Sequence, residues 1–219
     1  MGFDLAFAVK VFTALFAIMN PIANIPVFLS LTAGQSTGTR RRVAHKAVIG
    51  VTVGCLVSVA AGDAILGAFG LTVDDFRLAG GLMVLLIALS MLHGSASAQH
   101  QPSEKEMGGD EGTGGGSDAG DIAVYPLTIP LLVGPGTIAT LIVFGHTALA
   151  DGKIVSLAAG LAVFLIVLAA ALYAAPVLAR YLSPKVTAIM QRLMGMILAA
   201  IAMQMMVASL QVLFKGLAG

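Results

Sequence analysis

Long runs of apolar residues, separated by short polar segments, make up most of this 219-residue chain. Six runs approach or exceed the roughly 20 residues that a helix needs to cross a bilayer. They lie at about 5–31, 44–68, 75–93, 122–148, 154–178 and 187–213. The pattern predicts an all-α, polytopic membrane protein with six transmembrane helices.

The first and fourth runs contain prolines and glycines that a continuous helix does not favour. Residues 20–26 read Asn-Pro-Ile-Ala-Asn-Ile-Pro, and residues 126–136 read Pro-Leu-Thr-Ile-Pro-Leu-Leu-Val-Gly-Pro-Gly. An interior proline costs a helix roughly 3 kcal/mol. In a membrane, broken backbone is tolerated only where protein buries it or where it lines a cavity. We therefore expect both helices to be broken at a binding site, with a structural kink that touches no ligand as the alternative.

The chain also contains an internal duplication. Asn20-Pro21 and Gly134-Pro135 are 114 residues apart, and the Arg-Leu-Ala-Gly stretch at 77–80 returns as Arg-Leu-Met-Gly 115 residues later. Each copy holds three spans, so the second copy must enter the membrane inverted. We predict a first three-helix repeat over 1–93 and an inverted second repeat over 122–219. The Gly- and acid-rich segment 94–121 between them is predicted to be a flexible linker.

Composition and charge agree with a membrane protein. Hydrophobic residues make up 58% of the chain and charged residues 11%, with a mean hydropathy of +0.97, and the net charge of +1 does not indicate a nucleic-acid partner. Lys and Arg divide unevenly between the two sides of the predicted membrane. Eight lie on one side (Arg40, Arg41, Arg42, Lys46, Lys105, Arg180, Lys185 and Arg192) and four on the other (Lys10, Arg77, Lys153 and Lys215). The positive-inside rule then predicts both termini outside and segment 94–121 in the cytoplasm.

Few polar groups interrupt the spans. A face of small residues spaced by four, Gly50, Gly54, Ser58 and Gly62, indicates close helix contact within one subunit or in an oligomer, rather than a pore lining. Asp63 follows it, either as a solvated charge at a helix end or as the carboxylate that couples transport to an ion. Because no metal-binding cluster, catalytic motif or cysteine pair occurs, we expect no cofactor, no metal and no enzymatic activity.

The two breaks also indicate what such a site binds. Prolines release backbone carbonyls, which favour a cation, and the half-helices after the breaks place free amides near Ala23-Asn24 and Thr137-Ile138, which attract an anion. Without a charged side chain, this combination suits a small zwitterion. Further neutral hydrogen bonds are expected from five side chains: Asn20, Asn24, Thr128, Thr137 and Thr140.

Three stretches resemble the MarC family of bacterial and archaeal inner-membrane proteins. They begin at Asn20, Phe76 and Val124, and the likeness covers nearly the whole chain except the central loop. The family is placed near the LysE-type amino-acid exporters and includes transporters of small neutral amino acids such as glycine and alanine, coupled to an ion gradient. The resemblance implies site residues Asn20, Pro21, Asn24, Pro26, Gly134, Pro135, Gly136 and Thr137. It places Asp63 where the family usually has an acidic residue, often glutamate.

We therefore expect a secondary transporter in the plasma (inner) membrane of a bacterium or archaeon, moving small neutral amino acids by alternating access with a proton or sodium ion. Thr128 belongs to the predicted substrate site because it lies in the second broken stretch. Three alternatives stay open: export of another small metabolite or drug, a membrane enzyme or redox carrier, and a membrane protein without transport activity.

Overall fold

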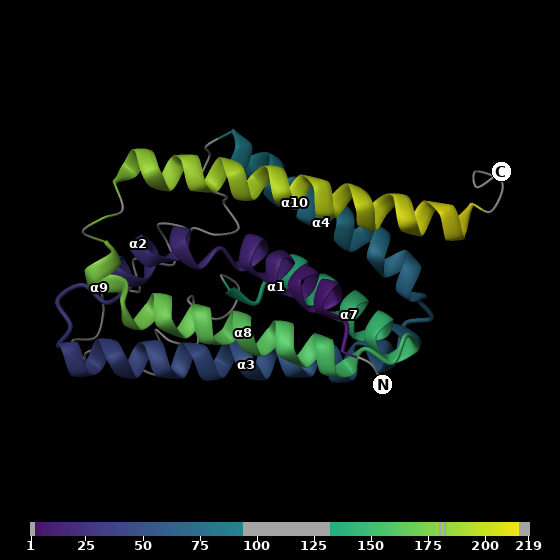
Figure 1. Ribbon diagram of the computed structural model, residues 1–219, viewed down its shortest axis with the longest axis horizontal. Helices are drawn as coiled ribbons and strands as arrows, with labels where there is room; N and C mark the ends of the chain where they lie inside the picture. The colour runs from purple at the N-terminus through teal and green to yellow at the C-terminus, as the bar shows by residue number, and fades with distance from the viewer. Residues whose placement is uncertain (1–2, 94–131, 180, 182, 215–219) are drawn as a thin grey trace, which may run out of the picture.

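The computed structural model describes residues 3–93, 132–179, 181 and 183–214. Every regular element in these ranges is a helix, as predicted. In chain order the helices are α1 (Leu5–Met19), α2 (Pro21–Leu31), α3 (Thr37–Ala68), α4 (Val73–Leu92), α7 (Pro135–Ala150), α8 (Ile154–Tyr173), α9 (Ala175–Leu178) and α10 (Pro184–Leu213). Most of them run along one long axis as a bundle (Figure 1).

Five segments of the described chain are long and apolar enough to cross a membrane. They are Leu5–Leu31, Thr37–Gly62, Val73–Leu92, Ile154–Tyr173 and Lys185–Leu213, and they confirm five of the six predicted spans. The described part of the remaining span is α7, a shorter apolar helix of 16 residues. Because the start of that predicted span lies outside the described residues, the six-helix count stays a prediction.

The second span begins earlier than its apolar run suggested. Its helix, α3, starts at Thr37, so the basic run Arg40–Arg42 lies in the first turns of a helix and not in a connecting loop. The Ser36 hydroxyl fixes this start by accepting a hydrogen bond from the Thr39 backbone N–H at 3.1 Å. Capping chemistry, rather than hydropathy, therefore sets this boundary.

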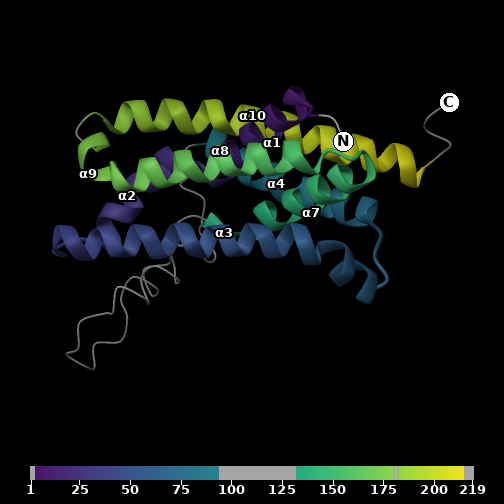
Figure 2. The same ribbon diagram turned by 60° about the horizontal axis from the view of Figure 1, so that its bottom comes forward.

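Helices from the two halves of the sequence pack against one another. Contacts are most extensive between α4 and α10, between α1 and α8, and between α7 and both α3 and α4. Figures 1 and 2 show α3 and α10 on opposite sides of the bundle, with α1, α7 and α8 between them. The main core cluster accordingly joins buried side chains from both halves, including Phe28 of α2, Leu141 of α7 and Phe164 of α8.

Gly54 and Gly62, from the face of small residues on α3, pack against Val133, shortly before α7, and against α7 itself. A Cβ atom added at Gly54 would lie 3.0 Å from Val133 Cγ1, and one added at Gly62 would lie 2.6 Å from Ile142 Cγ1. Both positions therefore need a residue without a side chain for the segments to approach this closely. The expectation of close helix contact is confirmed, and for Gly54 and Gly62 this contact lies within one chain.

The two ends of the bundle differ in what they carry. The start of α1 and the end of α10 lie at one end, together with the α3–α4 and α7–α8 connections (Figure 1). The α2–α3 connection and α9 lie at the opposite end, near the basic first turns of α3. The described elements thus place the basic run at the end of the bundle away from the N-terminal helix start.

Candidate functional site

The first break lies between α1 and α2 and turns on Asn20. Its φ of 37° and ψ of 71° place it in the left-handed region, which costs most residues about 1–2 kcal/mol but which asparagine visits more readily. Asn20 ends α1 by donating its N–H to the Phe16 carbonyl at 2.9 Å, and its Oδ1 starts α2 by accepting from the Ala23 N–H at 3.2 Å. Pro21 follows at the first helical position, where its missing N–H is not needed.

Asn24 bridges the same break from the other side. Its Nδ2 donates to the Met19 carbonyl at 2.6 Å, and both residues are buried. This bond satisfies a carbonyl that the end of α1 leaves outside its own ladder. By contrast, Asn20 Nδ2 is buried and has no hydrogen-bond partner among the described groups, so it is a donor that a bound ligand would satisfy.

The second break precedes α7 and turns on Gly134. Gly134 has φ −92° and ψ 176°, an extended conformation, and no side chain caps the helix that begins at Pro135. The Thr137 hydroxyl donates to the Leu132 carbonyl at 3.1 Å, and Thr137 is 2% exposed. Helix geometry leaves the N–H groups of Gly136 and Thr137 outside the helix's own ladder. This helix start therefore presents backbone donors without a side-chain cap.

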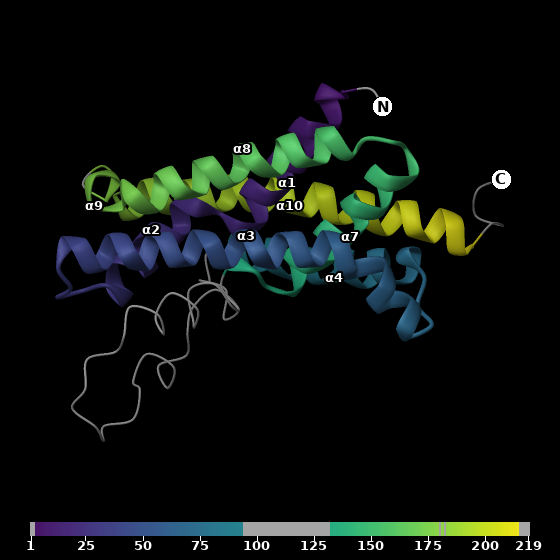
Figure 3. The ribbon, with the colours of Figure 1, turned by 90° about the horizontal axis from the view of Figure 1, so that it is seen from below.

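The structure brings the two breaks into one core. Met19, beside the first break, and Leu132, beside the second, belong to the same cluster of buried residues. α7 begins at about the level along the bundle where α1 ends (Figures 1 and 3). The described parts of both breaks therefore contribute to one core cluster, and their association into a substrate site stays a prediction.

Two details of the predicted first break are wrong. Pro26 does not interrupt the helix, because α2 continues through it to Leu31. The amides of Ala23 and Asn24 are not free, because they donate to Asn20 Oδ1 and to the Asn20 carbonyl, both at 3.2 Å. The Asn20 side chain, rather than the prolines, closes the start of α2.

The second break departs from its prediction at one amide. The Ile138 N–H, expected to be free, donates to the Gly134 carbonyl at 3.0 Å. Thr128 lies outside the described residues. Asp63 lies in α3, one residue beyond the end of the candidate span at Gly62, and its side chain is outside the described part.

A cavity of about 220 Å³ opens between α1, α4, α7 and α10, toward the end of the bundle that carries the N-terminus. Its lining residues are Phe7, Lys10, Arg77, Thr140, Val143, Phe144, Thr147, Ile201, Gln204, Met205 and Ala208. Of the side chains predicted to hydrogen-bond the substrate, Thr140 lines this cavity, whereas Asn20, Asn24 and Thr137 do not. Thr140 is 1% exposed, and its Oγ1 has no hydrogen-bond partner among the described groups.

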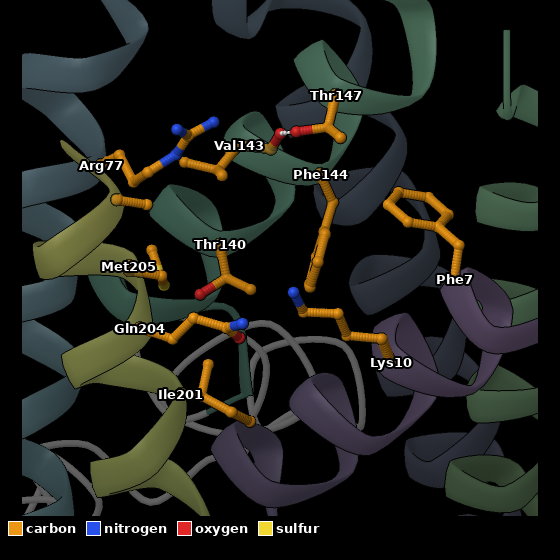
Figure 4. A pocket seen from close by; sticks show the side chains of 11 residues that line it. Phe7, Lys10, Arg77, Thr140, Val143, Phe144, Thr147, Ile201, Gln204 and Met205 are labelled. Atoms are coloured by element: carbon orange, nitrogen blue, oxygen red, sulfur yellow. Dashed lines mark hydrogen bonds between the residues drawn. The ribbon is translucent and has the colours of Figure 1, made fainter. Parts of the chain in front are cut away.

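Two cationic side chains, Arg77 and Lys10, line this cavity, and among the described residues only the first is paired with an acidic side chain. The Arg77 guanidinium lies 2.9 Å from Asp74 Oδ1, so its charge is paired along its own helix. Figure 4 shows the Lys10 ammonium reaching from α1 toward Gln204 and Thr140. The cavity is therefore more basic than the uncharged site that the sequence predicted.

A network of ion pairs closes the same end of the bundle. Lys153 Nζ lies 3.3 Å from Asp4 Oδ2 and 3.2 Å from Asp151 Oδ2, and the Asp4 N–H donates to Ser156 Oγ at 2.8 Å. The Phe7 amide, and then Lys153, holds the pKa of Asp4 below its ordinary value. The hydrogen bonds that the Lys153 ammonium donates to Asp151, and then to Asp4, raise the pKa of Lys153. The network ties the start of α1 to the α7–α8 connection.

Sequence reasoning used Lys10 and Arg77 only to assign orientation and missed their place in a cavity. A signal was present for Lys10: it is a cation within an apolar run, and no acidic residue stands three or four positions from it. Ionisable residues in such runs face a bundle interior or an aqueous cavity. Gln204 carried no comparable signal, because its position does not reveal which helices flank it.

The apolar helices and the buried breaks define a multi-pass integral membrane protein. Sequence comparison then identifies the family: residues 5–214 match the MarC family of integral membrane proteins, and the chain belongs to that family.

Relatives of similar length occur in bacteria and archaea. The chain is 32% identical over 217 residues to the UPF0056 membrane protein YhcE of Escherichia coli, covering 98% of this chain and 97% of YhcE. It is 32% identical to the UPF0056 membrane protein YvbG of Bacillus subtilis, with 95% and 96% covered. It is 35% identical to the UPF0056 membrane protein MJ1677 of Methanocaldococcus jannaschii, with 93% and 96% covered. No solved structure matches the chain.

Proposed function

We propose that this MarC-family protein is a secondary transporter of small neutral amino acids of the glycine and alanine type. The observation that carries the proposal is that the α1–α2 break and the start of α7 are each bridged by a buried side chain and both contribute to one core. Broken helices that meet inside a bundle are the structural basis of substrate sites in secondary transporters. Alternating access would then move one half of the chain against the other around the breaks.

The available donors support the carboxylate end of such a substrate. The capless start of α7 and the Lys10 ammonium both favour a carboxylate. Buried polar atoms without partners, Asn20 Nδ2 and Thr140 Oγ1, add neutral hydrogen-bonding groups. The cavity of about 220 Å³ is smaller than the roughly 300–1,000 Å³ of sites for drug-sized ligands. Its size favours a small metabolite over drug efflux.

An inverted repeat is part of the proposal. α1 of the first half packs on α8 of the second, and α7 of the second half packs on α3 of the first. α4 and α10, the last long helices of the two halves, pack on each other. This reciprocal pairing is what two inverted three-helix units would produce.

The proposed orientation rests on the distribution of charge. Arg40, Arg41, Arg42 and Lys46 gather in the first turns of α3, so we assign that end of the bundle to the cytoplasm by the positive-inside rule. Both termini then lie outside the inner membrane. Cysteine labelling of introduced residues at positions 3 and 38 in intact cells would test this assignment, since only position 3 is expected to react with an impermeant reagent.

The transport test is uptake of labelled glycine and alanine into proteoliposomes with imposed sodium or proton gradients. Gly134→Leu is expected to abolish accumulation, because its side chain would occupy the space in front of the α7 start. Gly67→Leu is the matched control, since a Cβ atom at Gly67 meets nothing within 4 Å. Absence of gradient-driven uptake by folded wild-type protein would overturn the proposal, and normal uptake by Gly134→Leu would overturn the site.

Asp63 is the proposed carboxylate for ion coupling. It follows the end of a candidate span, and aspartate near a transport pathway is able to carry a proton or bind a cation. Asp63→Asn is expected to leave amino-acid binding intact while uptake loses its dependence on the gradient. Unchanged gradient dependence in this variant would assign Asp63 to the solvated surface instead.

A further inference from the structure

A second pocket, of about 180 Å³, lies at the end of the bundle that carries the basic run. The first turns of α3 contribute Arg40 and Arg41 to its wall, and the end of α8 and α9 contribute Tyr173, Pro176 and Val177. Figures 1 and 3 show these three parts of the chain at the same end of the bundle. None of the lining residues that the structure describes is acidic. The pocket is therefore basic and suits an anion.

The end of α2 holds the Arg40 guanidinium in place. Its Nε donates to Thr32 Oγ1 and its Nη2 donates to the Thr32 carbonyl, both at 3.3 Å. Thr32 is buried, and its hydroxyl is itself fixed by donating to the Phe28 carbonyl at 2.8 Å. These bonds use two of the five N–H groups of a guanidinium. Arg40 is thus oriented before any ligand binds, and it keeps N–H groups that an anion is able to accept.

Tyr173 places the pocket at the level of the lipid headgroups. The candidate membrane span of α8 ends at this residue, which is also part of the pocket wall. Tyr173 is 45% exposed, and its hydroxyl lies 3.3 Å from His45 Nδ1 of α3. Tyrosine is enriched at the boundary between the hydrocarbon core and water, where its ring sits at headgroup level. The phosphates of the lipids lie at the same level.

The surface beside the pocket is apolar and exposed. Val177, which lines the pocket, is 59% exposed. Ile166 is 68% exposed and lies two helical turns before Tyr173, on the same face of α8. In a membrane-spanning helix, exposed apolar side chains of this kind contact acyl chains. A ligand with an anionic head and an apolar tail fits this surface better than a soluble anion does.

We propose that this pocket binds the phosphate headgroup of an anionic phospholipid. The phosphate lies between Arg40 and Arg41, whose N–H groups donate charge-assisted hydrogen bonds to its oxygens. Thr37, the first residue of α3, also lines the pocket, so the helix start adds partial positive charge. The acyl chains remain outside, along the exposed face of α8. Basic pockets between membrane helices bind lipid headgroups in this way. The inference concerns a lipid site and does not depend on transport or on the breaks.

The test is a lipid titration of the purified, delipidated full-length protein in detergent, followed by native mass spectrometry. The probes are phosphatidylglycerol and phosphatidylcholine with identical acyl chains. Phosphatidylglycerol is expected to bind at least about tenfold more tightly, because the choline cation is repelled by the two arginines. Glycerol phosphate, which has the anionic group without acyl chains, is expected to bind at least about tenfold more weakly than phosphatidylglycerol.

Two matched variants locate the site. Arg41→Gln removes one charge from the pocket wall and is expected to weaken phosphatidylglycerol binding about tenfold, as the loss of a charge-assisted hydrogen bond requires. Arg42→Gln removes the same charge from the next position of α3, and Arg42 does not line the pocket. Its phosphatidylglycerol affinity is expected to stay within about twofold of the wild type. Both variants should keep the thermal midpoint of the wild type, since both side chains are exposed.

Three results would overturn the proposal. Equal binding of the two lipids by the wild type would show that the pocket has no preference for an anionic headgroup. Equal losses in Arg41→Gln and Arg42→Gln would assign any preference to the general charge of the basic run and not to the pocket. Glycerol phosphate binding as tight as that of phosphatidylglycerol would assign the pocket to a soluble phosphate compound instead of a lipid.

Discussion

The first break places an asparagine at its turning point, whereas the second places a glycine there. Asn20 adopts a left-handed conformation and caps α2 with its own side chain. Gly134 is extended and provides no cap to α7. The first break therefore closes its helix start within the chain, and the second leaves its helix start to backbone donors alone. Of the two, the second is better suited to receive a ligand.

The breaks agree in a second feature. In each, a buried side chain on the new helix donates to the carbonyl five residues earlier, Asn24 to Met19 and Thr137 to Leu132. This bridge holds the segments on both sides of the break together and satisfies a carbonyl that the turn would otherwise strand. The comparison shows that the bridge is common to both breaks and that the cap distinguishes them.

The largest expected change in the free energy of unfolding follows substitution of Asn20, the turning point of the first break. Asn20→Leu should lower the free energy of unfolding by about 2–3 kcal/mol, because leucine disfavours the left-handed region and cannot cap α2. Asn20→Gly should cost only a few tenths of a kcal/mol, since glycine adopts that conformation freely and is a tolerated cap. Denaturant unfolding in detergent measures both. Equal losses in the two variants would show that backbone conformation is not the reason for Asn20.

The two side-chain bridges, formed by Asn24 and Thr137, are expected to have the next largest effect on stability. Asn24→Leu should cost about 1–3 kcal/mol by leaving the buried Met19 carbonyl without its partner. Thr137→Val should cost about 1 kcal/mol, at the lower end of that range, because its bond is longer, 3.1 Å against 2.6 Å. Thr13→Val is the control: Thr13 donates to the Val9 carbonyl inside the intact α1. A loss at Thr13 as large as at Asn24 would refute a special role for the bridges.

Much of this architecture follows from hydropathy and from the positions of proline. Apolar runs located five spans, because burying backbone in lipid demands helices of predictable length. Asn-Pro and Gly-Pro located both breaks, since proline at a first helical position marks a helix start. These features depend on neighbouring residues in the sequence, which is why they were predictable.

The remaining features depend on distant residues or on side-chain geometry. Hydropathy does not indicate that the Asn24 side chain donates a hydrogen bond to the Met19 carbonyl. It also does not indicate that the Asn20 side chain accepts one from the Ala23 N–H. The sequence shows Lys10 as a charge within an apolar run. It does not show that Lys10 and Gln204 line the same cavity, because α1 and α10 are far apart in the sequence and pack together only in the fold. Local patterns thus located the two breaks, whereas the polarity of the candidate cavity required the tertiary structure.

The two prolines that seemed equivalent in sequence offer a third and smaller test. Pro26 is exposed in the interior of α2, whereas Pro135 opens α7. Pro26→Ala should raise the free energy of unfolding by about 1 kcal/mol, part of the roughly 3 kcal/mol by which alanine exceeds proline inside a helix. Pro135→Ala should lower it by about 0.4–1 kcal/mol, because proline at that position restricts the unfolded chain without strain. Changes of the same sign in thermal unfolding would contradict this distinction.

The smallest expected change in stability carries the sharpest test of the comparison. Gly134→Ser supplies the second break with the cap that the first already has, and it should raise the free energy of unfolding by only a few tenths of a kcal/mol. If the Gly136 and Thr137 amides bind the substrate carboxylate, the serine hydroxyl competes for them and the KM for alanine uptake rises. A stabilised variant with an unchanged KM would show that the open helix start does not contact the substrate. In that case the difference between the breaks would be structural, and the cavity around Lys10 would be the remaining place for the carboxylate.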